Sequence, residues 1–306
     1  SHHYALTAQA EPSFLGLHTW GGTAVIVFFV ISGYLVTSSW YNDPSVLRFG
    51  ARRVLRLWPA LTTVTVLTAY GLGAWVTTLP LEDYWKNRAT LDYLNILRMQ
   101  IYYVLPGVFE HNPYPRGVNG SLWTIPLEVR CYVVLALAGL LRLMRWRSVW
   151  LACIALYMAW FIAKSSADIT GHVHYGRELG AFFLAGSALF VLREHWEHRP
   201  RAWLLGLGGV AALLWALGWR YTATLAFIPL LVLYAGTRST PVLRRFGRFG
   251  DPLPGLAADS GRIRQRTGDG RNRKSERFGE VLHLDRLLHR QSCAIDCASH
   301  GSRATN

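Results

Sequence analysis

The chain has 306 residues, of which 51% are hydrophobic and only 16% are charged. This charged fraction lies well below the ~25% of soluble domains, so the long apolar runs indicate a helical protein that crosses a membrane several times. The formal net charge of +14 does not indicate a nucleic-acid partner, because the arginines stand in short blocks between the apolar runs, as membrane topology requires. The first predicted partner is therefore the lipid bilayer.

We predict an all-α, polytopic bundle with seven full transmembrane spans and a partial one before them. The seven predicted spans are close to the ~20 residues that cross a bilayer, and they cover residues 21–40, 57–79, 124–141, 149–163, 179–192, 203–219 and 222–235. A polar and aromatic lead-in precedes them and contains His2, His3 and His18. In the long segment 80–119, an amphipathic piece around 91–105 is expected to lie at the membrane interface.

Arginine clusters occur in every second connection between the predicted spans. By the positive-inside rule, these clustered connections face the cytoplasm. This places Arg52, Arg53 and Arg56 at the inner surface, and it places the lead-in, the segment 80–119 and Glu128 on the outer side.

The sequence changes character between Asp251 and Pro252. We predict a membrane-embedded domain over residues 1–251 and a polar, basic, disordered tail over 252–306, where no apolar run is long enough to span a membrane. Two alternatives stay open for the tail. It is either a natural segment attracted to anionic lipid or a coding region read out of frame, as its lack of any periodicity suggests.

The cysteines and histidines do not predict a metal site. Two of the four cysteines lie in predicted spans, and Cys293 and Cys297 form an isolated C-x3-C without a second pair. His172 and His174 have no third ligand at a suitable spacing. No metal cofactor is expected.

One carboxylate, Glu128, stands near the start of the predicted span 124–141. An ionisable group at the edge of a bilayer-spanning segment is costly to keep there, so it indicates a functional site. The alternative is a simple ion pair between Glu128 and an arginine at the membrane surface.

Two further groups have the chemistry of a transfer site. Arg53 and Arg56 share a helix face, and guanidinium groups there suit phosphates, although from these residues alone ordinary positive-inside anchoring is the favoured explanation. His2 is suited to general-base catalysis near neutral pH, although an N-terminal His2-His3 pair also occurs as an expression remnant or a loop. The small residues in the motif at 28–34 favour close helix packing.

Taken together, these segments resemble the membrane-bound acyltransferase-3 family, whose members move acetyl or other acyl groups onto sugars and related acceptors. The segments that carry the resemblance are SHHYALT at 1–7, FFVISGYL at 28–35, RRVLRLWPA at 52–60 and NGSLWTIPLEVRCY at 119–132, with weaker matches at FFLAG (182–186) and FGD (249–251). The resemblance covers residues 1–251 in the family's order.

The resemblance implies a set of roles. His2 matches a histidine taken to be catalytic, Glu128 matches a glutamate near the outer end of a span, and Arg53 and Arg56 match the Arg-x-x-Arg associated with the acyl-coenzyme A donor. Within the segment at 119–132, Ser121 and Trp123 are the candidate substrate-binding residues. The implied protein is an O-acyltransferase of the bacterial inner membrane, with acetyl-coenzyme A as donor and an extracytoplasmic carbohydrate as acceptor.

Both ends of the chain depart from the family pattern. The family's arginine, ten residues before its histidine, would precede Ser1, and the Ser-Tyr motif and further spans that follow the Gly-Asp pair are replaced by Pro252 and the polar tail. We therefore expect a chain that is incomplete at both ends, and its activity as it stands is left open.

Two rival functions remain. A transporter or flippase for glycans or lipid-linked intermediates would also be polytopic, but it predicts an internal repeat, which the sequence lacks. A lipid-binding or scaffold protein would need neither the paired arginines nor the carboxylate.

Overall fold

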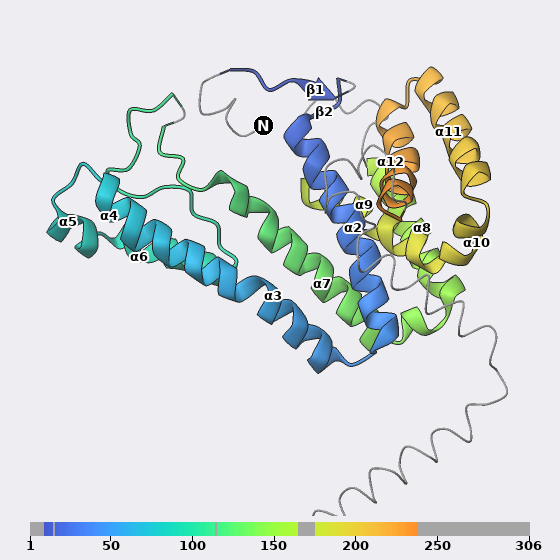
Figure 1. The fold of residues 1–306 in the computed structure, drawn as a ribbon, viewed down its shortest axis with the longest axis horizontal. Coiled ribbons are helices and arrows are strands. Elements are labelled where there is room, and N and C mark those ends of the chain that lie inside the picture. Colours follow the sequence, from blue (N-terminus) through green and yellow to red (C-terminus); the bar gives the residue numbers. More distant parts are fainter. Residues whose placement is uncertain (1–8, 15, 114, 165–174, 238–306) are drawn as a thin grey trace, which may run out of the picture. The chain divides into compact units, whose positions relative to one another are not determined.

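The computed structural model describes residues 9–14, 16–113, 115–164 and 175–237 (Figure 1). Within these residues the chain is almost entirely helical, and the two short strands β1 (Ser13–Phe14) and β2 (His18–Thr19) pair antiparallel just before the first described helix. The prediction of an all-α membrane protein is confirmed. His2, His3, His172, His174 and the predicted boundary at 251/252 lie outside the described residues.

Short connections join most of the described helices; the exceptions are the long segment between α4 and α7 and residues 165–174, between α8 and α9, which lie outside the described residues. The helices are α2 (Trp20–Asn42), α3 (Val46–Val66), the π-helix η1 (Leu67–Leu72), α4 (Gly73–Val76), α5 (Leu81–Lys86), α6 (Arg88–Asp92), the 3₁₀-helices η2 (Tyr93–Arg98) and η3 (Gly120–Thr124), α7 (Ile125–Leu140), the 3₁₀-helix η4 (Leu143–Arg145), α8 (Arg147–Lys164), α9 (Tyr175–Val191), α10 (Arg193–His198), α11 (Pro200–Ala216) and α12 (Arg220–Thr237).

Four helical segments of the described chain are long and apolar enough to cross a membrane: Trp20–Asn42, Val46–Val76, Gly120–Leu140 and Arg147–Lys164. The helices α11 and α12 are apolar but shorter. Each of the seven predicted spans corresponds to a helix, and most of their ends agree within a few residues. The number of crossings stays a prediction.

The predicted start of the second span was wrong. The helix begins at Val46 rather than at residue 57, and it continues through α3, η1 and α4 to Val76. The arginine block therefore belongs to the helix and not to the connection before it. Apolar residues alternate with the arginines along α3, and the carboxylate of Asp43 binds Arg48 at 2.6 Å and Arg52 at 2.8 Å, so it anchors the first turns.

The predicted amphipathic piece over 91–105 is also different in the structure. It consists of the short helices α6 and η2, which end at Arg98, followed by an irregular segment. Some of its apolar side chains join a small core under α3, whereas Leu91, Tyr103 and Val104 are exposed, and its predicted place at the membrane interface stays a prediction. The buried members of this core are Leu61, Ala69, Tyr84, Tyr93, Ile96, Leu105, Val108 and Leu122. The hydroxyl of Tyr84 donates to the carbonyl of Ala69 at 2.6 Å, within the π-helical turn.

The most extensive helix pair is α2 against α9 (Figure 1). A Cβ atom on Gly33 would collide with the backbone carbonyl of Phe183, and one on Gly186 would collide with the carbonyl of Val30. These reciprocal glycine contacts let the two backbones touch, as small residues do in membrane helix pairs. The packing role predicted for the motif at 28–34 is therefore confirmed. The glutamate-bearing helix α7 packs against α2, α3 and α9, so the close α2–α9 pair also helps to position it.

Candidate active site

Glu128 lies in the first turn of α7, where the sequence favours a helix start. The 3₁₀-helix η3 leads directly into α7, and Pro126 stands at one of its first two positions, where its missing N–H costs no hydrogen bond. A carboxylate in a first turn is stabilised by the positive end of the helix dipole. The side chain is nonetheless almost removed from solvent, since Glu128 is 4% exposed. Such a buried carboxylate needs partners.

The partners of Glu128 come from its own helix and from α3. Tyr132, one turn further along α7, donates its hydroxyl to Oε1 of Glu128. Arg53 and Arg56 on α3 interact electrostatically with the same carboxylate. We call these four residues the Glu128 cluster. It joins one buried acid to a tyrosine by a hydrogen bond and places two guanidinium groups near it, neither of them within ion-pair distance of the carboxylate.

Arg53 is the more enclosed of the two arginines. Its Nη2 donates to Oγ of Ser39 on α2 at 3.0 Å, and its guanidinium carbon lies 5.4 Å from the ring centre of Phe49 and 5.5 Å from that of Tyr132. Arg56 is exposed. The cluster thus has one guanidinium held among aromatic rings and one that is open to a ligand.

This arrangement corrects the separation expected from the sequence. We predicted Arg53 and Arg56 at one membrane surface and Glu128 on the opposite side, but the structure brings them together. The physical reason is the early start of α3. Because the helix begins at Val46, a rise of 1.5 Å per residue carries Arg53 and Arg56 roughly 10–15 Å along the helix, beside the first turns of α7.

The two candidate substrate-binding residues lie on η3, immediately before α7. Ser121 is exposed, and its hydroxyl donates to Oδ1 of Asn119 at 3.4 Å. Trp123 is half-buried. Both precede Glu128 at the end where α7 begins.

A second buried acid was missed by the sequence reasoning. Glu178, in the first turn of α9, has a side chain only 3% exposed, and its Oε1 lies 3.3 Å from Nε2 of His18. The ring of His18 meets that of Tyr221 on α12 edge-on at 5.7 Å, and the Tyr221 hydroxyl also interacts with Glu178. We call these three residues the Glu178 cluster.

The polar atoms of the Glu178 cluster are poorly satisfied. Nε2 of His18, Oε1 of Glu178 and the hydroxyl of Tyr221 are all buried, and none makes a well-formed hydrogen bond within the described residues. Burial lowers the pKa of His18 below its usual value. The sequence does carry a signal for this cluster, a carboxylate directly before an apolar run. The predicted span starts at residue 179, whereas α9 begins at Tyr175, so the prediction leaves Glu178 outside the helix.

The structure bears on whether any group of side chains could bind a metal ion. Within the described residues, no group of three or more His, Cys, Asp or Glu side chains is arranged to hold a metal ion.

Comparison with known proteins decides the family. Residues 1–243 match the acyltransferase domain that defines acyltransferase-3 proteins. The chain belongs to the acyltransferase-3 family.

The relatives of this acyltransferase-3 chain include three curated proteins. An O-acetyl transferase of Shigella phage Sf6 is 37% identical over 138 residues, which are 45% of this chain and 40% of the relative. Nodulation protein 10 of Rhizobium leguminosarum is 26% identical over 201 residues, 62% of this chain and 48% of the relative. An uncharacterised protein of Haemophilus influenzae is 25% identical over 154 residues, 48% of this chain and 61% of the relative. The chain thus spans less than two thirds of each relative. No solved structure matches it significantly.

Proposed function

We propose that this acyltransferase-3 chain performs O-acyl transfer in a membrane, with acetyl-coenzyme A as the cytoplasmic donor and a hydroxyl of an extracytoplasmic carbohydrate as the acceptor. The family supports acyl transfer, and the name of the phage relative supports an acetyl group and an oxygen acceptor. The bacterial inner membrane is the compartment that gives access to both substrates. The observation that carries the proposal is the Glu128 cluster, a buried acid with two guanidinium groups inside membrane-length helices.

The two arginines have different roles in this proposal. Arg56 is exposed and contacts a phosphate of the donor, for which a guanidinium fork is well suited. Arg53 is held by Ser39 and the aromatic rings, so it supplies positive charge beside Glu128 and, with Arg56, draws the donor toward the cluster. Ser121, which is exposed, and Trp123, which is half-buried, contact the acceptor from the 3₁₀ turn before α7.

The chemical step uses His2 as a general base. His2 takes the proton of the acceptor hydroxyl, the oxygen attacks the thioester carbonyl, and the carbon–sulfur bond breaks. The leaving coenzyme A thiolate takes up a proton from His2, so the histidine is regenerated. Glu128 orients His2 or binds the sugar. A relay through an acyl-histidine balances equally, because histidine also acts as a nucleophile.

The test is an activity assay on the full-length protein in native membranes. Radiolabelled acetyl-coenzyme A is supplied, and base-labile label is counted in the carbohydrate fraction. We expect His2→Ala to abolish transfer and Glu128→Gln to reduce it strongly, with membrane insertion unchanged. His3→Ala is the matched control, because it removes the neighbouring imidazole and should retain transfer. Full activity in His2→Ala would remove His2 from the mechanism. Loss of transfer in both His2→Ala and His3→Ala would indicate a structural role for the segment that contains the two histidines.

A further inference from the structure

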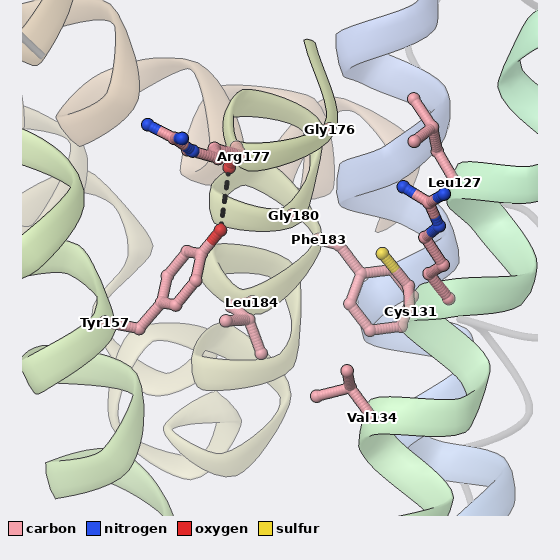
Figure 2. Close-up of a pocket in the computed structure, with 10 residues that line it drawn as sticks. Leu127, Cys131, Val134, Tyr157, Gly176, Arg177, Gly180, Phe183 and Leu184 are labelled. Atoms are coloured by element: carbon pink, nitrogen blue, oxygen red, sulfur yellow. Dashed lines mark hydrogen bonds between the residues drawn. The ribbon is translucent and has the colours of Figure 1, made fainter. Parts of the chain in front are cut away.

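A pocket of about 420 Å³ lies between α7, α8 and α9, and no member of either carboxylate cluster lines it. Figure 2 shows Leu127, Cys131 and Val134 of α7 on one side and Tyr157 of α8 on the other. Phe183 and Leu184 of α9 form the wall between them. The glycines of α9 leave this space open, since a Cβ atom on Gly180 would come within 3.0 Å of the Tyr157 hydroxyl. The acyl-transfer proposal assigns no function to this space.

The pocket is charged at one end and apolar at the other. Arg177, in the first turn of α9, and Arg130, in the second turn of α7, line the end at which these two helices begin. Val134 and Leu184 line the deeper end. In the part of the chain that the structure describes, no carboxylate lies within ion-pair distance of either guanidinium. The charged end therefore attracts an anion.

Aromatic contacts hold the charged end of the pocket in place. The Tyr157 hydroxyl donates to the backbone carbonyl of Arg177 at 3.0 Å, and the Arg177 guanidinium carbon lies 5.6 Å from the ring centre of Trp160. Tyrosine and tryptophan gather where a membrane meets water. These contacts indicate that the two arginines lie at the level of the lipid headgroups, with the apolar end of the pocket toward the bilayer centre.

The surfaces beside the pocket are apolar and exposed. On α7, Val133, Val134 and Leu137 are about half exposed, and on α8 Leu156 is 72% exposed. Exposed apolar side chains on a membrane-length helix are covered by lipid tails. A molecule that enters the pocket from this side has an apolar chain, and the two arginines select a negatively charged head.

We propose that this pocket binds one anionic phospholipid, with its phosphate at Arg130 and the upper part of an acyl chain against Val134 and Leu184. The guanidinium of Arg177 lies over Trp160 on the other side of the charged end and adds to its positive charge. Basic pockets between transmembrane helices bind anionic headgroups on the cytoplasmic side of membranes. The same attraction between guanidinium and phosphate groups operates here at the end where α7 begins. A soluble phosphate compound would use the arginines but not the apolar end. The proposal does not depend on acyl transfer, and it holds whether or not the chain is catalytically active.

The test measures lipid binding to the purified full-length protein by native mass spectrometry in detergent. Dioleoylphosphatidylglycerol, which carries a net negative charge, is titrated against dioleoylphosphatidylcholine, which has the same chains and no net charge. We expect the first phosphatidylglycerol to bind at least tenfold more tightly than phosphatidylcholine. The double variant Arg130→Gln/Arg177→Gln should lose this preference. The matched control Arg98→Gln/Arg116→Gln, which removes two exposed arginines of the segment 80–119, should keep it.

A second variant separates a lipid from a bare phosphate. Val134 is half exposed, so Val134→Trp fills the apolar end without disturbing the buried core, and we expect it to weaken phosphatidylglycerol binding as well. Equal affinity for both lipids in the wild type, or an unchanged preference in the double arginine variant, would overturn the site. Unchanged binding in Val134→Trp, with displacement by soluble glycerophosphoglycerol, would overturn the lipid as its occupant.

Discussion

Glu128 and Glu178 occupy equivalent positions in the fold but have different partners. Each lies in the first turn of an apolar helix, each is almost fully buried, and each interacts with a tyrosine. The partners of Glu128 include Arg53 and Arg56, whose charge is permanent. The cationic partner available to Glu178 is His18, which is charged only when protonated. The positive charge beside Glu128 is therefore fixed at every physiological pH, whereas the positive charge beside Glu178 depends on the protonation of His18.

The largest effect should come from removing the permanent charge of the Glu128 cluster. We expect Arg53→Ala to lower the rate of acyl transfer by about 100-fold or more, because a fixed charge that stabilises a reacting site is typically worth that much. Arg56→Ala should mainly raise the KM for acetyl-coenzyme A, since this side chain is exposed and free to contact the donor. Steady-state transfer rates at varied donor concentration distinguish the two effects.

Arg52→Gln is the control for these arginine variants. Arg52 is the exposed neighbour of Arg53 and binds Asp43 instead of the cluster, so its removal should leave both kcat and KM nearly unchanged. If Arg53→Ala and Arg56→Ala both raised only the KM for the donor, the two arginines would be equivalent phosphate contacts. The distinction drawn here between a held and an open guanidinium would then be wrong.

We expect a smaller effect when pH changes the protonation of His18 in the Glu178 cluster, and it should appear in the free energy of unfolding. Because burial lowers the pKa of His18 in the folded protein, the unfolded chain takes up a proton below about pH 6.5 that the folded chain does not. The free energy of unfolding should therefore fall as pH drops through about 6.5, and level off below the folded-state pKa. Thermal unfolding in detergent between pH 8 and 5 measures this slope, which His18→Gln should reduce.

The controls for His18 separate burial from ion pairing. His111→Gln removes an exposed histidine of the segment 80–119 and should leave the pH slope as in the wild type. If an ionised Glu178 instead stabilises protonated His18, the wild type would gain stability on acidification, and Glu178→Gln would abolish the gain. That result would contradict the direction argued from burial.

The sequence predicted the helices of the fold better than it predicted which site residues lie close together. Hydropathy located every described apolar helix, because the cost of leaving backbone groups unpaired in lipid forces long apolar runs into helices. It could not locate the start of α3, since Arg48 to Arg56 interrupt the apolar pattern while their long side chains still allow a helix. That error placed Arg53 and Glu128 apart. The contact of Glu178 with His18 joins segments 160 residues apart, and no local pattern encodes such a distance.

The smallest effects should come from replacing the tyrosine of each cluster with phenylalanine, and they should appear in the free energy of unfolding. Tyr132→Phe removes a hydrogen bond to a buried carboxylate, so we expect it to cost about 1.5–3 kcal/mol of unfolding free energy if Glu128 stays ionised. Tyr221→Phe should cost less than about 1 kcal/mol, because the Tyr221 hydroxyl makes no well-formed hydrogen bond among the described residues. Thermal unfolding of both variants under one detergent condition gives the comparison. Equal losses would mean that the Tyr221 hydroxyl holds Glu178 as firmly as Tyr132 holds Glu128, and the contrast between a satisfied and an unsatisfied cluster would have to be abandoned.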